Sequence, residues 1–189
     1  PEKMRQWVRH GDFYTDPAKH PLHTKSGKIE LYCSEIARFN VPDCPPVPKY
    51  LEPSEFLGNA KPGHVHVVSP HPYNRVHSQM AQADVRFEQN VKGRQHVLIS
   101  VEDAADKGIK NGDLVELSNS RGALIAGAVV TDKIMKGVVS LEEGNWIQLD
   151  SKGRGNSGAL NMIPTNVASS GLSQATSANT CIAELKGRD

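Results

Sequence analysis

Hydrophobic and polar residues alternate over several short stretches from His64 onward. HVHVVS (64–69) alternates and then becomes apolar, and RQHVLIS (94–100) has a similar texture. Side chains of a β-strand point to opposite faces in turn, so a period of two residues is typical of a strand with one buried face. We therefore predict strands in both stretches.

Four further stretches fit short strands. LVELSN (114–119) and ALIAGAVVT (123–131) are joined by the turn SRG, which indicates a hairpin. GVVSLEEG (137–144) and NTCIAELK (179–186) follow, separated by the glycine-rich loop SKGRGNSG and the stretch ALNMIP. Many short strands with little helix favour a mainly β fold closed into a barrel.

One short helix is predicted near residues 101–108. Ser100 is a suitable N-cap, with Asp103 as a weaker capping-box partner. Gly108 ends the helix, and Asn111-Gly112 makes a turn. The helix places four apolar side chains on one face, those of Val101, Ala104, Ala105 and Ile109.

The chain before His64 has another texture. Residues 1–23 show no clear period and are predicted to be irregular. TKSGKIELYCSEIARFN (24–40) indicates a turn, a short strand through Ile29, Leu31 and Cys33, and a short helix that Ser34 caps. The segment 41–63 is too rich in proline for regular structure, so we expect an extended linker.

Composition narrows the class of protein. The 189 residues are 38% hydrophobic and 23% charged, which is enough to build a core. A net charge of +1 argues against binding to nucleic acid or a membrane surface by bulk charge, and no apolar run is long enough to span a bilayer. The start at Pro1 leads us to expect a fragment of a longer protein. Three cysteines without a CxxC pair are expected to be packed thiols.

The stretch SPHPYNRVHSQM (69–80), which we term the corner, carries unusual chemistry for the end of a strand. His71, Arg75, His77 and Ser78 offer hydrogen-bond donors to a phosphate, a polar ring or a carbonyl group. Asn161 and Gln174, farther along, could recognise the edge of a heterocycle. No phosphate-binding glycine motif is present. For any single residue, chemistry alone favours the simpler interpretation, in which it satisfies carbonyl groups of the barrel.

Metal binding and acid–base catalysis have weaker support. His64 and His66 share a face of the predicted strand, but no acidic or cysteine partner lies at a recognisable spacing. Asp103, Glu142 and Glu143 are possible acids or bases, yet capping and solvated faces explain them more simply. We predict no metal ligand and no catalytic residue in this chain.

Several motifs in order resemble the C-terminal molybdopterin-dinucleotide-binding domain of the DMSO reductase family. They are SPHPYNRVHSQ (69–79), the stretch from VKGRQHVLIS to EEGNW (91–146), and LNMIPTNVASSGLSQATSANTCIAEL (160–185). RxHSQ and GxW are typical of the trimethylamine N-oxide, dimethyl sulfoxide and biotin sulfoxide reductases. The resemblance covers about residues 12–186.

The resemblance implies a six-stranded double-psi β-barrel with short helices and an extended N-terminal arm. Residues 1–62 would be the arm and linker that end the preceding domain, and 63–189 the barrel. The corner would contact a bis(molybdopterin guanine dinucleotide) cofactor. Pro164 and Asn166 stand where the family has threonine and aspartate, which puts contacts there in doubt. The implied cofactor-binding residues are Ser69, His71, Arg75, His77, Ser78, Gln79, Asn161 and Gln174.

The implied parent is a molybdenum oxidoreductase of anaerobic respiration that reduces S-oxides or N-oxides by oxygen-atom transfer. Its molybdenum ligand would lie upstream, so the fragment should be inactive and lack the cofactor. Its partners would be the upstream domains, a small oxide and an electron donor, without nucleic acid or membrane insertion. A periplasmic location is expected, with a cytoplasmic one as the alternative. A free-standing barrel without catalysis, and the formate dehydrogenase or nitrate reductase branch, stay open as alternatives, although RVHSQ argues against the latter two.

Overall fold

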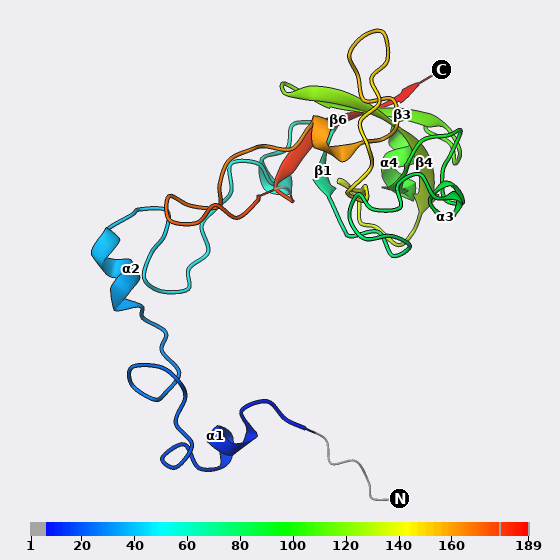
Figure 1. Ribbon diagram of the computed structural model, residues 1–189. Coiled ribbons are helices and arrows are strands. Elements are labelled where there is room, and N and C mark those ends of the chain that lie inside the picture. Colours follow the sequence, from blue (N-terminus) through cyan, green and yellow to red (C-terminus); the bar gives the residue numbers. More distant parts are fainter. Residues whose placement is uncertain (1–6, 178, 189) are drawn as a thin grey trace, which may run out of the picture. The chain divides into compact units, whose positions relative to one another are not determined.

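The chain divides into two units, one on either side of the Leu51–Glu52 bond for most of their length. A computed structural model describes residues 7–177 and 179–188 (Figure 1). One unit, here called the arm unit, comprises Pro1–Leu51 and Ser170–Leu172, and the other, the barrel unit, comprises Glu52–Ser169 and Ser173–Asp189. The domain boundary expected between residues 62 and 63 stays a prediction.

Six strands close into a barrel in the order β1-β5-β2-β4-β3-β6. The mainly β, double-psi barrel expected from the sequence is therefore confirmed, and every predicted strand from His64 onward is present. The strands are β1 (His64–Val68), β2 (His96–Ser100), β3 (Leu114–Asn119), β4 (Gly122–Thr131), β5 (Val138–Ser140) and β6 (Cys181–Arg188).

Two parallel pairs fix where the loops of the barrel meet. β1 runs parallel to β5, with Val68 opposite Ser140, and β2 runs parallel to β4. The remaining neighbours are antiparallel. Because parallel strands end at the same edge of a sheet, the corner after β1 and the segment after β5 begin side by side.

Alternating strand residues fill the barrel. Val65 and Val67 of β1 are buried, as are Val115 and Leu117 of β3, while the residues between them are not. Removal of this apolar surface from water drives the closure of the barrel. The largest fully buried side chains are Ile99, Leu117, Leu124, Ile125, Leu141, Ile163, Leu185, Val65, Val67, Val97, Val115 and Val139.

Helix α4 (Val101–Asp106) follows β2 as predicted, with two differences in detail. Ser100 is the N-cap and its hydroxyl accepts a hydrogen bond from the Asp103 amide at 3.0 Å. Asp103 does not complete a capping box, because its carboxylate accepts from the Ser100 hydroxyl and from the Gly137 amide. The predicted apolar face is also wrong in part, since Val101 and Ala105 are exposed.

Three further short helices lie in the barrel unit. They are η1 (Leu57–Asn59), α3 (Asp84–Phe87) and η2 (Leu160–Met162). The end of the linker is fixed to the barrel by Glu55, which binds the Arg121 guanidinium through both carboxylate oxygens at 2.6 and 2.9 Å. The pKa of Glu55 is lowered mainly by this hydrogen bonding to Arg121.

The arm unit contains two short helices, α1 (Gly11–Thr15) and α2 (Ser34–Phe39). The helix expected near Ser34 is confirmed, but its N-cap is Cys33 rather than Ser34. The expected strand through Ile29 and Leu31 is absent, and the expectation of irregular structure up to residue 23 is wrong at α1. The part of that stretch at residues 1–6 lies outside the described residues.

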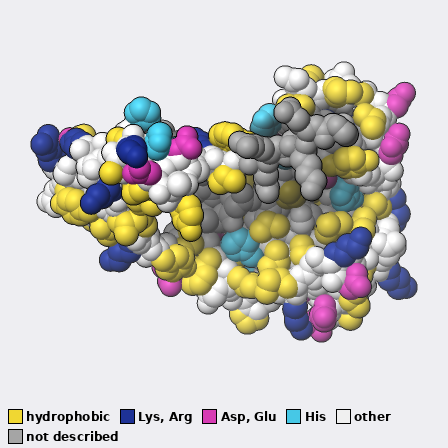
Figure 2. Space-filling view, turned by 90° about the horizontal axis from the view of Figure 1, so that it is seen from below, with side chains coloured by type: hydrophobic (Ala, Val, Ile, Leu, Met, Phe, Trp, Pro, Cys, Tyr) yellow, Lys and Arg dark blue, Asp and Glu magenta, His cyan; other side chains and the backbone are white. Residues whose placement is uncertain are grey.

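No residue from 7 to 51 is buried, and the arm exposes many apolar side chains. Hydrophobic side chains also remain visible over much of the molecular face in Figure 2. None of the described helices is long and apolar enough to cross a membrane.

The three thiols are free, but they differ in burial. Cys181 is buried, Cys44 half-buried and Cys33 exposed, so packing as expected holds best for Cys181 and fails for Cys33. Burial raises the pKa of Cys181 to about 11, which keeps this thiol protonated and unreactive near neutral pH.

Candidate functional site at the corner after β1

The corner leaves the barrel where β1 ends. The Ser69 amide donates to the Asn179 side chain at 2.7 Å, which ties the start of the corner to the approach to β6. His77 and Met80 have φ values of 49° and 57°, in the left-handed region that non-glycine residues adopt at a cost. Such strain gathers at sites where the surroundings enforce it, and here it marks the second half of the corner.

The segment 141–146 (LEEGNW) runs alongside the corner and holds it. The amides of Leu141 and Glu143 donate to the carbonyls of Val68 and Pro70, at 3.0 and 3.2 Å, which continues the alignment of β5 with β1. The Trp146 indole then donates to the Ser78 carbonyl at 3.1 Å. These three bonds secure the corner at its beginning and in its second half.

Gly144 allows the closest approach between the two segments. Its φ is 80°, and a Cβ atom at this position would lie 2.2 Å from the His77 carbonyl oxygen and 2.9 Å from the Arg75 guanidinium. Any larger residue would have to displace the backbone of the corner. The glycine and tryptophan of the GxW motif therefore have separate roles, one in close approach and the other in hydrogen bonding.

Glu143 brings two histidines of the corner together. Its Oε1 atom lies 2.6 Å from Nδ1 of His71 and 2.5 Å from Nδ1 of His77. The two rings meet edge to face, with centroids 4.9 Å apart and an interplanar angle of 89°. Burial favours the neutral form of Glu143, but the hydrogen bonds from both histidines outweigh it, so the pKa of this carboxyl is lowered.

The side chain of Arg75 is buried, unlike those of the histidines on either side of it in the corner. Only 6% of the residue is exposed, and its guanidinium donates to the His77 carbonyl at 2.8 Å and to the Gln95 side chain at 3.3 Å. Gln95 in turn donates to Glu142 at 3.2 Å. A cofactor contact at Arg75, which the resemblance implies, would require an accessible guanidinium, and here the residue is buried. Burial lowers the pKa of Arg75, and Glu142 and Glu143 oppose that shift.

A second buried arginine supports the 141–146 segment. Arg86 of α3 donates to the Asn145 side chain, and Asn145 donates to the Ser157 carbonyl. The Ser157 hydroxyl donates back to the Trp146 carbonyl at 2.7 Å. The glycine-rich loop thus braces the segment that holds the corner.

The remaining expected site residues are exposed, and the structure brings only some of them together. Ser78 and Gln79 lie on the corner, whereas Asn161 lies on η2 and Gln174 in the loop before β6. Gln174 lines a hollow of about 190 Å³ with Asn166 and neighbouring residues. Within the described part of the chain, no hydrogen bond joins Asn161 or Gln174 to the corner.

Glu143 is the residue that reasoning from the sequence missed. A solvated face is the simpler interpretation of Glu143 in the sequence, but its carboxylate bonds two histidines of the corner, although it lies more than 60 residues beyond them in the chain. The parallel pairing of β1 and β5 brings the two segments side by side. One ring nitrogen each of His71 and His77 and one carboxylate oxygen of Glu143 therefore lie within 4.8 Å of one another. His66, which the sequence analysis considered as a metal ligand, instead lies with its Nε2 atom 2.7 Å from the Asn179 carbonyl.

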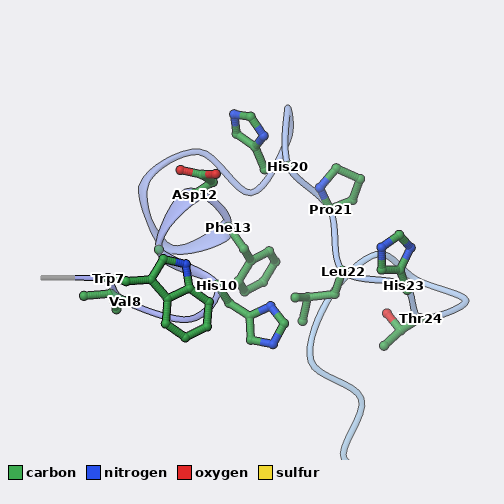
Figure 3. Close-up of a pocket in the computed structure, with 11 residues that line it drawn as sticks. Trp7, Val8, His10, Asp12, Phe13, His20, Pro21, Leu22, His23 and Thr24 are labelled. Carbon is green, nitrogen blue, oxygen red and sulfur yellow. The ribbon is translucent and has the colours of Figure 1, made fainter. Parts of the chain in front are cut away.

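A hollow of about 1020 Å³ lies in the arm unit (Figure 3). Its side chains include Trp7, Phe13 and Leu22, and Trp7 is 80% exposed. None of the expected site residues lines it. His10, Asp12, His20 and His23 also line this hollow. Among the described residues, however, the cluster of three histidine or carboxylate groups lies at the corner, so we assign the candidate site there.

The fold and the site together define a class of domain: a closed β-barrel that presents a braced, polar hydrogen-bonding corner. The sequence profile described as "Molydopterin dinucleotide binding domain" matches residues 65–182. The chain belongs to this family of molybdopterin dinucleotide-binding domains. The match includes the corner and the 141–146 segment.

Curated relatives agree with this assignment. Trimethylamine-N-oxide reductase of Haemophilus influenzae is 40% identical over 98% of this chain and 23% of that protein. Biotin sulfoxide reductase of Cereibacter sphaeroides is 38% identical over 92% of this chain and 24% of that protein. The chain therefore spans about a quarter of the length of these relatives.

Among solved structures, acetylene hydratase from Pelobacter acetylenicus has the same fold. Its TM-score is 0.64 at 18% identity, over 90% of this chain and 25% of that one.

Proposed function

We propose that this chain is the cofactor-binding domain of a molybdenum oxidoreductase that reduces S-oxides or N-oxides by oxygen-atom transfer. The observation that carries the proposal is the corner itself. An exposed polar loop is braced at the common end of β1 and β5, inside the stretch that matches the family. The relatives are oxide reductases by name, and this chain is 38–40% identical to two of them.

The residues of the corner suit a bis(molybdopterin guanine dinucleotide) cofactor. The side chains of His71 and His77 are 75% and 63% exposed, and both lie on the same loop as the exposed Ser78 and Gln79. Imidazole, hydroxyl and amide groups match the alternating donors and acceptors at the edge of a pterin or guanine ring. Arg75 does not fit as a direct contact in this arrangement, because its guanidinium is buried and bonded within the barrel.

The roles divide accordingly. Ser69, His71, His77, Ser78 and Gln79 would hold and orient the cofactor, and Arg75 would set the shape of the loop beneath them. Asn161 and Gln174 would contact other parts of the same large ligand. The bound cofactor supplies the oxygen-atom transfer, so this domain contributes binding and orientation rather than a catalytic side chain.

The whole parent enzyme extends beyond this chain. Its other domains would supply the molybdenum ligand and the substrate funnel, and we propose that the exposed apolar side chains of the arm contact them. A small oxide and an electron donor complete its partners, and we place the parent in the periplasm. A leader sequence in the full reading frame would support that location, and its absence would favour the cytoplasm.

The test uses the parent enzyme. His71→Ala and His77→Ala should each lower the molybdenum and pterin content of the purified enzyme, together with its oxide reduction by a reduced viologen. His64→Ala is the matched control, because His64 lies at the start of β1, away from the corner, and its ring nitrogen contacts the Pro62 carbonyl at a long 3.4 Å. Unchanged cofactor content in both corner variants would refute the assignment of the corner.

A further inference from the structure

The shared carboxylate of Glu143 fixes how the two imidazoles present their nitrogens. Its Oε1 atom is at hydrogen-bond distance from Nδ1 of both His71 and His77. An ionised carboxylate has only acceptor sites. The lowered pKa of Glu143 keeps it ionised, so each Nδ1 must carry the hydrogen of the bond.

The outer nitrogens then have a defined character. In a neutral imidazole one nitrogen donates and the other accepts, and the partner of one sets the role of the other. With hydrogens on Nδ1, the Nε2 atoms of His71 and His77 are acceptors. Among residues 7–177 and 179–188, neither Nε2 atom has a hydrogen-bond partner. The two rings pack edge to face, with an interplanar angle of 89°.

The groups around this cluster leave Glu143 as the one carboxylate that bonds the histidines. Glu142 instead accepts a hydrogen bond from the Gln95 side chain at 3.2 Å. Arg75 reaches the His77 carbonyl rather than its ring, and Arg86 bonds Asn145. No other described charged group bonds either ring, so the tautomers depend on Glu143.

We propose that Glu143 is a positioning residue that locks His71 and His77 as a pair of hydrogen-bond acceptors, so that the corner selects an N–H donor edge of a heterocyclic ligand. The identity of that ligand, the amino and amide edge of a pterin or guanine, rests on the function proposed above. The role of Glu143 in fixing the two tautomers does not depend on that function.

The first experiment measures the tautomers in the full 189-residue chain without cofactor. Nitrogen-15 NMR of the histidine rings at pH 8 should show unprotonated Nε2 and protonated Nδ1 for His71 and His77. In Glu143→Gln the lock should be lost, since an amide can donate as well as accept, and the Nε2 resonances should move toward the protonated position. Glu142→Gln is the matched control, because it removes the same charge from the adjacent residue and should leave both rings unchanged.

Three results would overturn the lock. One is protonated Nε2 in the wild-type rings, and another is an equal response of the rings to both variants. The third is stoichiometric binding of added Zn²⁺ that is lost in Glu143→Gln and in the histidine variants, which would make the cluster a metal site instead. The amide spectrum of each variant reports whether the barrel is folded, so a misfolded variant is replaced by Glu143→Ala.

The second experiment measures pterin and molybdenum content in the parent enzyme, so that the two proposals fail separately. Glu143→Gln should lose most of the bound cofactor, as His71→Ala and His77→Ala should. Full loading of Glu143→Gln beside depleted histidine variants would refute the lock and leave the proposed function intact. A confirmed lock beside fully loaded histidine variants would refute the proposed function and leave the lock intact.

Discussion

The barrel unit and the arm unit differ in where their stability resides. In the barrel, every strand contributes buried side chains to one closed core. In the arm, no residue between 7 and 51 is buried, and Trp7, Tyr14 and Ile29 are 80%, 90% and 71% exposed. Burial of apolar area is the main stabilising contribution in folding. The buried core therefore stabilises the barrel unit, whereas the arm unit gains little stability from burial of its own apolar side chains.

The corner belongs to the barrel side of this comparison. It is a loop, yet it is bonded to the 141–146 segment, to Asn179 and, through Arg75, to the interior. Binding sites on loops work when a rigid scaffold positions them.

The largest effect is expected from the core. Leu117→Ala should destabilise the chain by about 2–5 kcal/mol, because it removes buried methyl groups and leaves a cavity. Leu31→Ala, in the arm, should change stability by less than about 0.5 kcal/mol, since Leu31 is 71% exposed. Urea denaturation, monitored by far-UV circular dichroism, measures the stability of both variants. Equal losses would mean that the arm shares the core of the barrel.

Alanine substitutions at Gly144 and Gly153 distinguish the cost of a steric clash from the cost of backbone strain. Both have positive φ, 80° and 75°, so alanine should cost either site about 1–2 kcal/mol in backbone strain. Only at Gly144 would the new Cβ meet backbone atoms, whereas nothing lies within 4 Å at Gly153. Gly144→Ala should thus cost a further ~1–3 kcal/mol from overpacking. Indistinguishable unfolding midpoints would show that the corner and the 141–146 segment are not in tight contact.

Arg75 tests whether the corner is braced from inside. Arg75→Ala should destabilise the chain by about 1–3 kcal/mol, because the His77 carbonyl and Gln95 lose a buried donor. Arg38→Ala provides the control in the arm, where the guanidinium is exposed and pairs with Glu35 at 3.3 Å. Thermal unfolding of the two variants should differ clearly, and a neutral Arg75→Ala would contradict an internal role.

The smallest effect concerns a loop of the barrel under acid. Hydrogen bonds from the Arg154 side chain and backbone lower the pKa of Asp150 to about 2. Because the folded pKa lies below the unfolded value of about 3.9, the contribution to stability is present above that value. It is lost as the pH falls toward 2. Carboxyl NMR titration should show Asp150 titrating near 2 in the wild type and closer to 4 in Arg154→Gln; no difference would contradict the pairing.

Local pattern predicted the barrel well, and the contacts between distant residues explain what it missed. The alternation in 64–69 and 179–186 and the cap at Ser100 depend on neighbours in sequence, and the structure confirms them. Ile29 and Leu31 alternate equally well, but a strand also needs a partner for its backbone groups, and this stretch has none among the described residues.

The candidate site shows the same limit. The residue types of the corner were visible in the sequence, and so was its resemblance to the family. The burial of Arg75 and the role of Glu143 were not, since both follow from the pairing of β1 with β5 and from the path of the 141–146 segment. Long-range parallel pairing leaves no trace in local periodicity.

Hydrogen exchange of the parent enzyme, with and without its cofactor, tests the central proposal most directly. Peptides that cover 69–80 and 141–146 should exchange more slowly in the cofactor-loaded enzyme, because the ligand covers the corner and steadies the segment that braces it. The β3–β4 hairpin, 114–131, should exchange equally in both forms and serves as the internal reference. Protection confined to other regions, with 69–80 unchanged, would contradict the assignment of the corner as the cofactor site.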